Sequence, residues 1–161
     1  MAVPSRRQYQ IYIERPVDVV FAFHTDLANH VRIAPEDAPE EVISGVDATL
    51  QLGACVTFRA RHGAIWRTLT SRITEWTPPD SFTDEQVEGP FASWIHRHRF
   101  VTFQNGTLMT DILEYEVGSG PLGALAERIW LGKHLDYFFR YRQNSAKHLL
   151  EYLGRIKGSG N

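Results

Sequence analysis

The segment WIHRHRF, residues 94–100, places two imidazole side chains two positions apart, and Asp111 follows a short turn later. Imidazole and carboxylate groups bind the polar groups of ligands, move protons near neutral pH, or hold metal ions. The choice among these roles depends on whether His96, His98 and Asp111 face water or the interior. The turn between the two strands answers that question.

Asn105-Gly106 predicts a two-residue hairpin turn between the strands that carry these side chains. The pairs expected on one face are Gln104–Thr107, Phe100–Asp111, His98–Leu113, His96–Tyr115 and Trp94–Val117. Because side chains alternate along a strand, Arg97 and Arg99 share the other face, where we expect both to meet Glu114 in water. The histidines then lie inside, with Asp111 diagonal to His98.

This inner face is too polar for a dry core and is typical of a ligand cavity. Arg67 either clamps a carboxylate there or turns outward, if its strand slips by one residue. Arg142 lies on the apolar stripe of the last helix and is expected to pair with an inner carboxylate or an anionic ligand. The expected lining residues are Phe58, Ile65, Arg67, Leu69, Trp94, His96, His98, Phe100, Met109, Asp111, Leu113, Tyr115, Phe138 and Arg142.

The elements that position these residues follow from hydrophobic periodicity. Alternation predicts strands, and spacing of three and four residues from Pro121 onward predicts one long C-terminal helix, kinked or divided at Gly132. Two short helices are expected after the first strand, the second capped by Asp26. The helix must lie on the apolar face of a single antiparallel sheet, which gives an α+β fold. The expected strands cover residues 7–14, 40–45, 51–61, 64–76, 81–88, 92–103 and 107–117.

Length and composition restrict the function. We expect one domain over residues 1–157 and a disordered tail at residues 158–161. A net charge of −2 argues against nucleic-acid binding, and Cys55 as the single cysteine suits a reducing compartment. With no signal-peptide pattern and no apolar run of membrane-spanning length, the cytoplasm is the expected location. The acidic segment 35–41 is expected to be a solvated loop beside the cavity mouth.

Four segments carry a resemblance to a known family: IERPVDVVFAFHTDLANHVRIAP, FTDEQVEGPFASWIHRHRF, MTDILEYEV and FRYRQ. With them the chain, from residue 7 to about 155, resembles bacterial ligand-binding SRPBCC proteins. This START-like, helix-grip superfamily includes polyketide cyclases and aromatases, lipid-transfer domains and plant hormone receptors. The resemblance implies a seven-stranded antiparallel sheet curled around the C-terminal helix, with a hydrophobic ligand between them.

Three roles remain open for His96, His98 and Asp111: a structural polar network, recognition of a ligand hydroxyl or carbonyl, and general acid–base catalysis. A metal site has suitable ligand types, but alternate histidines on a strand are common and nothing else in the sequence supports one. We therefore expect neither metal nor cofactor. His24 and His30 are expected to be packing or solvent residues.

The expected function is binding of a small hydrophobic molecule such as a lipid, isoprenoid, aromatic or polyketide-like compound. The alternative is an enzyme of cyclase, aromatase or dehydratase type that uses His96, His98 and Asp111. A protein-interaction module that uses the outer arginine–threonine face ranks last, because that face has no large apolar patch. The sequence leaves the oligomeric state open.

Overall fold

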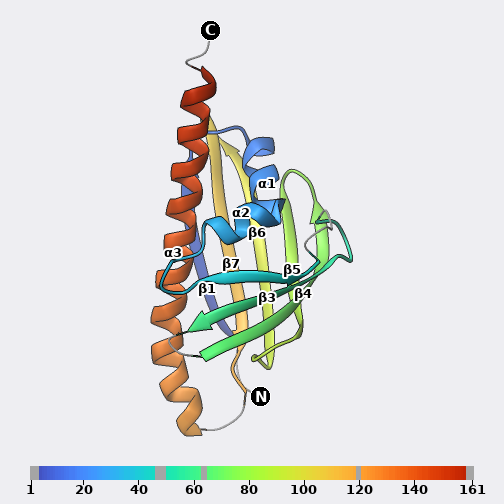
Figure 1. The fold of residues 1–161 in the computed structure, drawn as a ribbon, viewed down its shortest axis with the longest axis vertical. Coiled ribbons are helices and arrows are strands. Elements are labelled where there is room, and N and C mark those ends of the chain that lie inside the picture. Colours follow the sequence, from blue (N-terminus) through green and yellow to red (C-terminus); the bar gives the residue numbers. More distant parts are fainter. Residues whose placement is uncertain (1–3, 46–49, 63–64, 119–120, 159–161) are drawn as a thin grey trace.

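The computed structural model describes residues 4–45, 50–62, 65–118 and 121–158. These form seven strands and three helices (Figure 1). The strands are β1 (Ser5–Ile13), β2 (Glu40–Ser44), β3 (Cys55–His62), β4 (Ile65–Thr77), β5 (Ser81–Glu88), β6 (Ser93–Phe103) and β7 (Gly106–Glu116). The helices are α1 (Val17–Thr25), α2 (Leu27–Arg32) and α3 (Pro121–Gly158). The tail was predicted at residues 158–161, but Gly158 still belongs to α3, and residues 159–161 lie outside the described residues.

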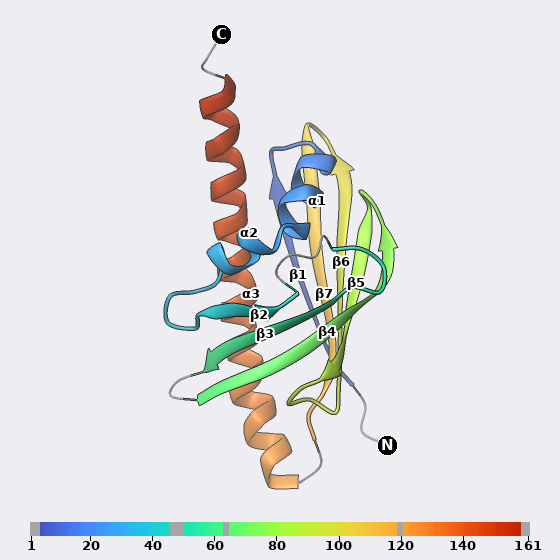
Figure 2. The ribbon, with the colours of Figure 1, turned by 45° about the vertical axis from the view of Figure 1, so that its right-hand side comes forward.

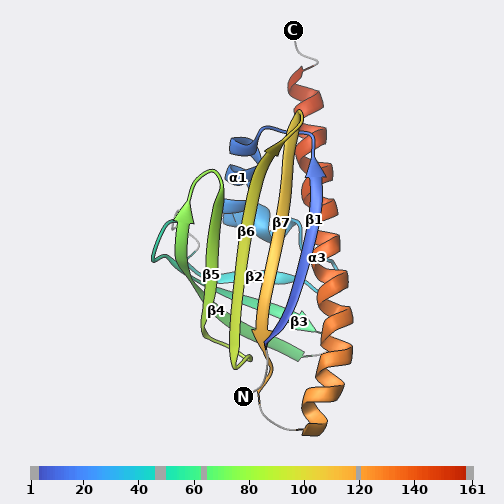
Figure 3. The same ribbon diagram turned by 180° about the vertical axis from the view of Figure 1, so that it is seen from behind.

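All seven strands belong to one antiparallel sheet in the order β1-β7-β6-β5-β4-β3-β2. The sheet is strongly curved, so that β2, β3 and β4 cross in front of β6 and β7 (Figure 2). Helix α3 runs the length of the molecule beside β1 (Figure 3), and α1 and α2 cover the concave side. The seven-stranded sheet with its long C-terminal helix, expected from the sequence, is confirmed.

The β6–β7 hairpin differs from the predicted register by two residues. Phe103 pairs with Gly106, so the turn residues are Gln104, which has a φ of 50°, and Asn105. Gly106 instead begins β7, where a Cβ atom would collide with the backbone oxygen of Ile13. The glycine therefore permits close packing against β1 and not the expected turn geometry.

The two-residue shift keeps every side chain on its predicted face but changes its partner. His98 lies directly opposite Asp111, and His96 lies opposite Leu113. On the outer face Arg97 reaches Glu114 diagonally at 3.2 Å, whereas Arg99 lies opposite Thr110 and the expected pairing of Arg99 with Glu114 was wrong. The observed register therefore brings Asp111 closer to the two histidines than the predicted register would.

The helices follow their sequence signals with one exception. The Asp26 side chain accepts a hydrogen bond from the Ala28 amide at 2.9 Å and caps α2 as expected. Helix α3 is continuous, so the predicted division at Gly132 was wrong. Gly132 instead leaves room for the Arg7 guanidinium, which binds Asp136 on α3 at 2.8 Å. Among the described residues, no helix is long and apolar enough to cross a membrane.

Candidate functional site

A cavity of about 150 Å³ lies between the sheet, the short helices and α3. The cavity wall is mainly apolar. Arg67 and Pro90 line the cavity and are exposed, so the cavity opens beside these two residues. The apolar part of the wall consists of Phe23, Leu27, Ile33, Leu50, Val56, Phe58, Ala60, Leu69, Ile73, Phe82, Phe91, Trp94, Leu131, Leu135, Phe138 and Phe139. In other proteins an apolar cavity of this volume holds a ligand about the size of one aromatic ring.

The structure places the predicted lining residues in two groups. Eight of them line the cavity: Phe58, Arg67, Leu69, Trp94, His96, His98, Phe138 and Arg142. The other six do not: Ile65, Phe100, Met109, Asp111, Leu113 and Tyr115.

Two physical causes explain why these six residues lie outside the cavity wall. Ile65 begins β4 at the sheet end and is 56% exposed. The others lie under the helices: Phe21 of α1 covers Phe100 at 5.5 Å between ring centroids, and Tyr115 packs in the cluster that contains Phe139 of α3. Strand alternation gives the inner face, but helix packing decides which part of that face a cavity reaches.

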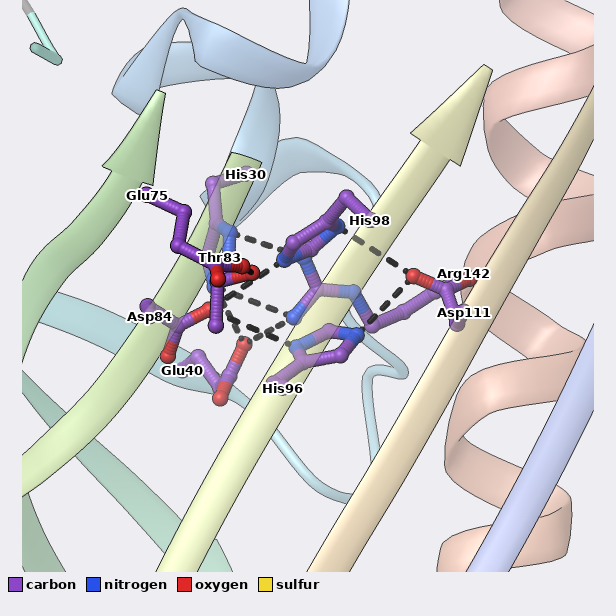
Figure 4. A network of polar contacts seen from close by, with 9 residues as sticks. All are labelled: His30, Glu40, Glu75, Thr83, Asp84, His96, His98, Asp111 and Arg142. Carbon is purple, nitrogen blue, oxygen red and sulfur yellow. Dashed lines mark hydrogen bonds and ion pairs between the residues drawn. The ribbon is translucent and has the colours of Figure 1, made fainter. Parts of the chain in front are cut away.

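Five residues form the polar group that we call the histidine cluster: Asp84, His96, His98, Asp111 and Gln143 (Figure 4 shows the first four). His96 Nε2 lies 2.9 Å from Asp111 Oδ1, and His98 Nδ1 lies 3.3 Å from the same oxygen. On the other side, Asp84 Oδ2 lies 3.2 Å from His98 Nε2 and 3.6 Å from His96 Nδ1. Gln143 of α3 donates to Asp111 Oδ2 at 2.7 Å. Both imidazoles therefore lie between two carboxylates.

Asp84 was missed in the sequence analysis. Strand 81–88 was predicted, but its faces were not assigned. Asp84 pairs with His96 and Phe82 with His98 across β5 and β6, so both project to the inner face. The alternation Phe82, Asp84 against His96, His98 is the signal that would have found it.

The histidine cluster shifts the pKa values of its two histidines in opposite directions. Burial would lower the pKa of His98, but contacts with Asp111 and Asp84 raise it above its ordinary value. Burial and the neighbouring His98 lower the pKa of His96. Burial would raise the pKa values of the two carboxyl groups, but the imidazoles hold that of Asp84 below its usual range and that of Asp111 well below it. The cluster thus makes His98 the more basic of the two imidazoles and favours the ionised form of both carboxyl groups.

Aromatic rings fix the orientation of the imidazoles. Phe82 stacks on His98 with 4.0 Å between ring centroids, and Phe139 of α3 meets His96 edge-on at 5.1 Å. The two imidazole rings lie 3.8 Å apart. Neither ring can turn without disturbing a neighbour, so the donors and acceptors that reach the cavity are held in place.

A second polar group, the arginine cluster, consists of Arg142, Glu40 and His30 (Figure 4). Arg142 Nη1 lies 2.8 Å from Glu40 Oε2, His30 Nε2 lies 3.0 Å from the same oxygen, and His30 stacks on Phe58 at 4.5 Å. Pairing of Arg142 with an inner carboxylate is confirmed. That carboxylate belongs to the segment 35–41, so the expectation of a wholly solvated loop was wrong.

His24 and His30 both line the cavity, which the sequence analysis did not expect. His24 Nδ1 donates to the Val20 carbonyl one helical turn earlier at 2.9 Å, which fixes the ring. Burial lowers the pKa of His24 to about 4. Burial, followed by the Arg142 charge, lowers the pKa of His30. These shifts favour the neutral form of both His24 and His30 near neutral pH.

Three solved structures with this fold show the range of proteins that share it. The Zhui aromatase/cyclase from Streptomyces sp. R1128 has a TM-score of 0.74 and 16% identity, over 98% of this chain and 99% of that chain. TTHA0849 from Thermus thermophilus has a TM-score of 0.73 and 17% identity, over 92% and 99%. Ginseng major latex-like protein 151 from Panax ginseng has a TM-score of 0.65 and 18% identity, over 91% and 97%.

The family of this chain is identified from its sequence. No curated protein matches the chain. Residues 13–132 match the family described as "Polyketide cyclase / dehydrase and lipid transport". That match covers most of the chain, from the end of β1 into α3. The chain therefore belongs to the polyketide cyclase/dehydrase and lipid transport family of START-like, SRPBCC proteins.

Proposed function

We propose that this protein binds a small, largely apolar, neutral molecule that carries a hydroxyl or carbonyl group. The observation that carries the proposal is the wall of the cavity, in which aromatic and aliphatic side chains surround a few fixed polar groups. Apolar area supplies affinity in such a site, and polar groups supply orientation and specificity. Membership of a family described by lipid transport supports the same function.

The charges in the interior of the cavity support a neutral ligand, and Arg67, the other cationic lining residue besides Arg142, is exposed at the opening. The histidine cluster contains two carboxylates, Asp84 and Asp111, which repel an anion. Arg142 is neutralised by Glu40 at 2.8 Å and is not free to bind a ligand carboxylate. A neutral hydroxyl can donate to Nε2 of His24, which lines the cavity and has no hydrogen-bond partner among the described residues.

Native mass spectrometry tests this proposal even while the ligand is unidentified. Protein purified from its own host is transferred intact, and the bound small molecules are extracted and identified. We expect a neutral apolar compound in a one-to-one complex. Protein that carries no small molecule, and that binds no neutral aromatic compound in titration, would contradict the proposal.

A second candidate function is a reaction of cyclase or dehydratase type. His98 lies at the wall between Asp84 and Asp111, a position suited to a residue that exchanges protons with a bound molecule. The Zhui aromatase/cyclase shares the fold, which is compatible with such a reaction but does not imply it. If His98→Gln folds and turns over an identified ligand as fast as the unmodified protein, this candidate is wrong.

The proposed location is the cytoplasm. Cys55 is exposed and is the only cysteine of the chain, so the fold needs no oxidising compartment.

A further inference from the structure

We propose that Asp84, His96 and His98 form a binding site for a divalent first-row transition-metal ion at the wall of the cavity. The proposal concerns these three side chains, and it does not depend on the identity of the organic ligand. It replaces the expectation from sequence that no metal is bound, because Asp84 supplies the third ligand that the sequence analysis lacked.

The ligand atoms converge on one point. One atom from each of the three side chains lies within 4.8 Å of the other two. Asp84 Oδ2 is 3.2 Å from His98 Nε2 and 3.6 Å from His96 Nδ1. Two atoms that each lie about 2.1 Å from an ion at a tetrahedral angle are roughly 3.4 Å apart. An ion between these atoms therefore requires only small movements of the side chains.

The surroundings orient the imidazoles as an outer coordination shell does. A histidine that binds a metal usually donates its other ring N–H to a carboxylate, which fixes the ring. Here the far nitrogens of His96 and His98 lie 2.9 and 3.3 Å from Asp111 Oδ1, while Gln143 holds Asp111 Oδ2 at 2.7 Å. Asp111 Oδ1 thus accepts a hydrogen bond from His96, whereas His98 Nδ1 lies beside the same oxygen without hydrogen-bond geometry, and the nitrogens that remain face Asp84.

The charge of the cluster favours a cation. The carboxylates of the buried Asp111 and the partly buried Asp84 flank two imidazoles whose ring centroids are 3.8 Å apart. Balancing them with two imidazolium ions places like charges in contact. A divalent ion with two neutral imidazoles balances the same carboxylates without that repulsion.

Two nitrogens and one oxygen suit Zn²⁺ or Fe²⁺, and three protein ligands leave a coordination position open. Because His96 and His98 line the cavity, that position faces it and is available to a water molecule or to an oxygen of a bound molecule. Both ring nitrogens of His30 contact Arg142, whereas His24 binds the Val20 carbonyl through Nδ1 and keeps Nε2 without a hydrogen-bond partner among the described residues. With the ion bound, His98 is a ligand and not a proton donor, so this site and the second candidate function exclude each other.

Metal titration of the full chain, prepared without a histidine tag, tests the site. The protein is dialysed against EDTA, mixed with Zn²⁺ or Co²⁺ alone, separated from free ion, and analysed for metal. We expect one Zn²⁺ per chain, visible absorption from the Co²⁺ form, and a higher Tm with Zn²⁺ than without. Failure of the unmodified protein to retain either ion would overturn the proposal.

Variants locate the ion. Asp84→Asn keeps the shape of the side chain and is expected to weaken Zn²⁺ binding by roughly 100-fold or more, and Asp111→Asn by roughly 10–100-fold. His148→Gln, on the exposed side of α3, is the control and should bind as the unmodified protein does. Circular dichroism checks that each variant is folded. Undiminished binding by folded Asp84→Asn, or equal losses in His148→Gln, would place the ion elsewhere and overturn the site.

Discussion

Gln143 Nε2 of helix α3 lies 2.7 Å from Oδ2 of Asp111, a buried carboxylate in the middle of β7. The hydrogen bond joins the long helix to the strand opposite the two histidines. Both side chains are at least nine-tenths buried, so water cannot replace either partner. Through this contact, helix α3 and the histidine cluster stabilise each other.

Gln143→Leu is therefore expected to destabilise the protein. The substitution keeps the side-chain volume but leaves Asp111 Oδ2 without its donor, at a cost of about 1–3 kcal/mol. Urea unfolding measures the change in the free energy of unfolding. Asn144→Leu, one position further on the exposed side of the helix, is the control and should change it little. Equal values for the two variants would show that the Gln143 contact is not stabilising.

Acid is expected to destabilise the protein through His24, whose pKa burial lowers to about 4. The folded state holds His24 neutral, whereas the unfolded chain takes up its proton near the ordinary pKa of about 6.5. The stability that this group contributes is complete above pH 6.5 and is lost as the pH falls toward 4, by up to roughly 3 kcal/mol.

The variant His24→Phe separates this effect from other titrations. Phenylalanine does not titrate, so the variant should lose less stability than the unmodified protein between pH 6.5 and pH 4. Urea unfolding at several pH values measures both slopes. His148→Phe, at an exposed position, should leave the slope unchanged. Parallel slopes for His24→Phe and the unmodified protein would mean that His24 is not the responsible group.

Arg142→Met is expected to destabilise the fold by roughly 1.5–3 kcal/mol, because it removes the guanidinium from the partly buried Glu40 carboxylate. The double variant Arg142→Met/Glu40→Leu removes both charges and should recover part of this loss. A cycle of thermal or urea unfolding measurements gives the coupling. Arg140→Met, at an exposed position of the same helix, serves as the control. Additive effects of the two substitutions would show that the pair is not coupled.

Gly106→Ala is expected to destabilise the hairpin by roughly 1–3 kcal/mol, since the added methyl group meets the backbone oxygen of Ile13 as well as the Tyr12 side chain, and the backbone oxygen cannot move aside. Gly118→Ala is the control, because a Cβ there meets nothing within 4 Å. Thermal unfolding compares the two variants. An unchanged Tm for Gly106→Ala would show that packing of Gly106 against Ile13 does not set the register of β6 and β7.

The hairpin also shows what could be predicted from the sequence and what could not. Strand alternation was sufficient to place His96, His98 and Asp111 on one inner face, because a shift of two residues does not change faces. It could not give the register, because the role of Gly106 depends on Ile13 in a distant strand. Local turn preference and long-range packing favoured different strand pairings, and the observed register is the one that the packing of Gly106 against Ile13 favours.

Contacts between distant segments also limited how much of the site could be predicted. Phe58, Leu69 and Phe138 were predicted from periodicity because each lies on the apolar face of its own element. Glu40 and Asp84 were missed because their roles come from partners on other elements, Arg142 in one case and two histidines in the other. Charged residues in loops or at strand centres have no pattern of their own that indicates burial. Only the arrangement of the chain in space reveals them.

Binding of a neutral aromatic probe to two matched variants tests most directly whether the cavity holds a ligand. Leu69 lines the cavity, whereas its neighbour Thr68 faces outward on the same strand. Calorimetric titration with phenol should show binding to the unmodified protein and to Thr68→Trp, and at least roughly tenfold weaker binding to Leu69→Trp, whose indole fills the cavity. The anion benzoate should bind more weakly than phenol to the unmodified, metal-free protein. Equal affinity of phenol for Leu69→Trp and Thr68→Trp, or no binding to any of the three proteins, would contradict ligand binding in this cavity.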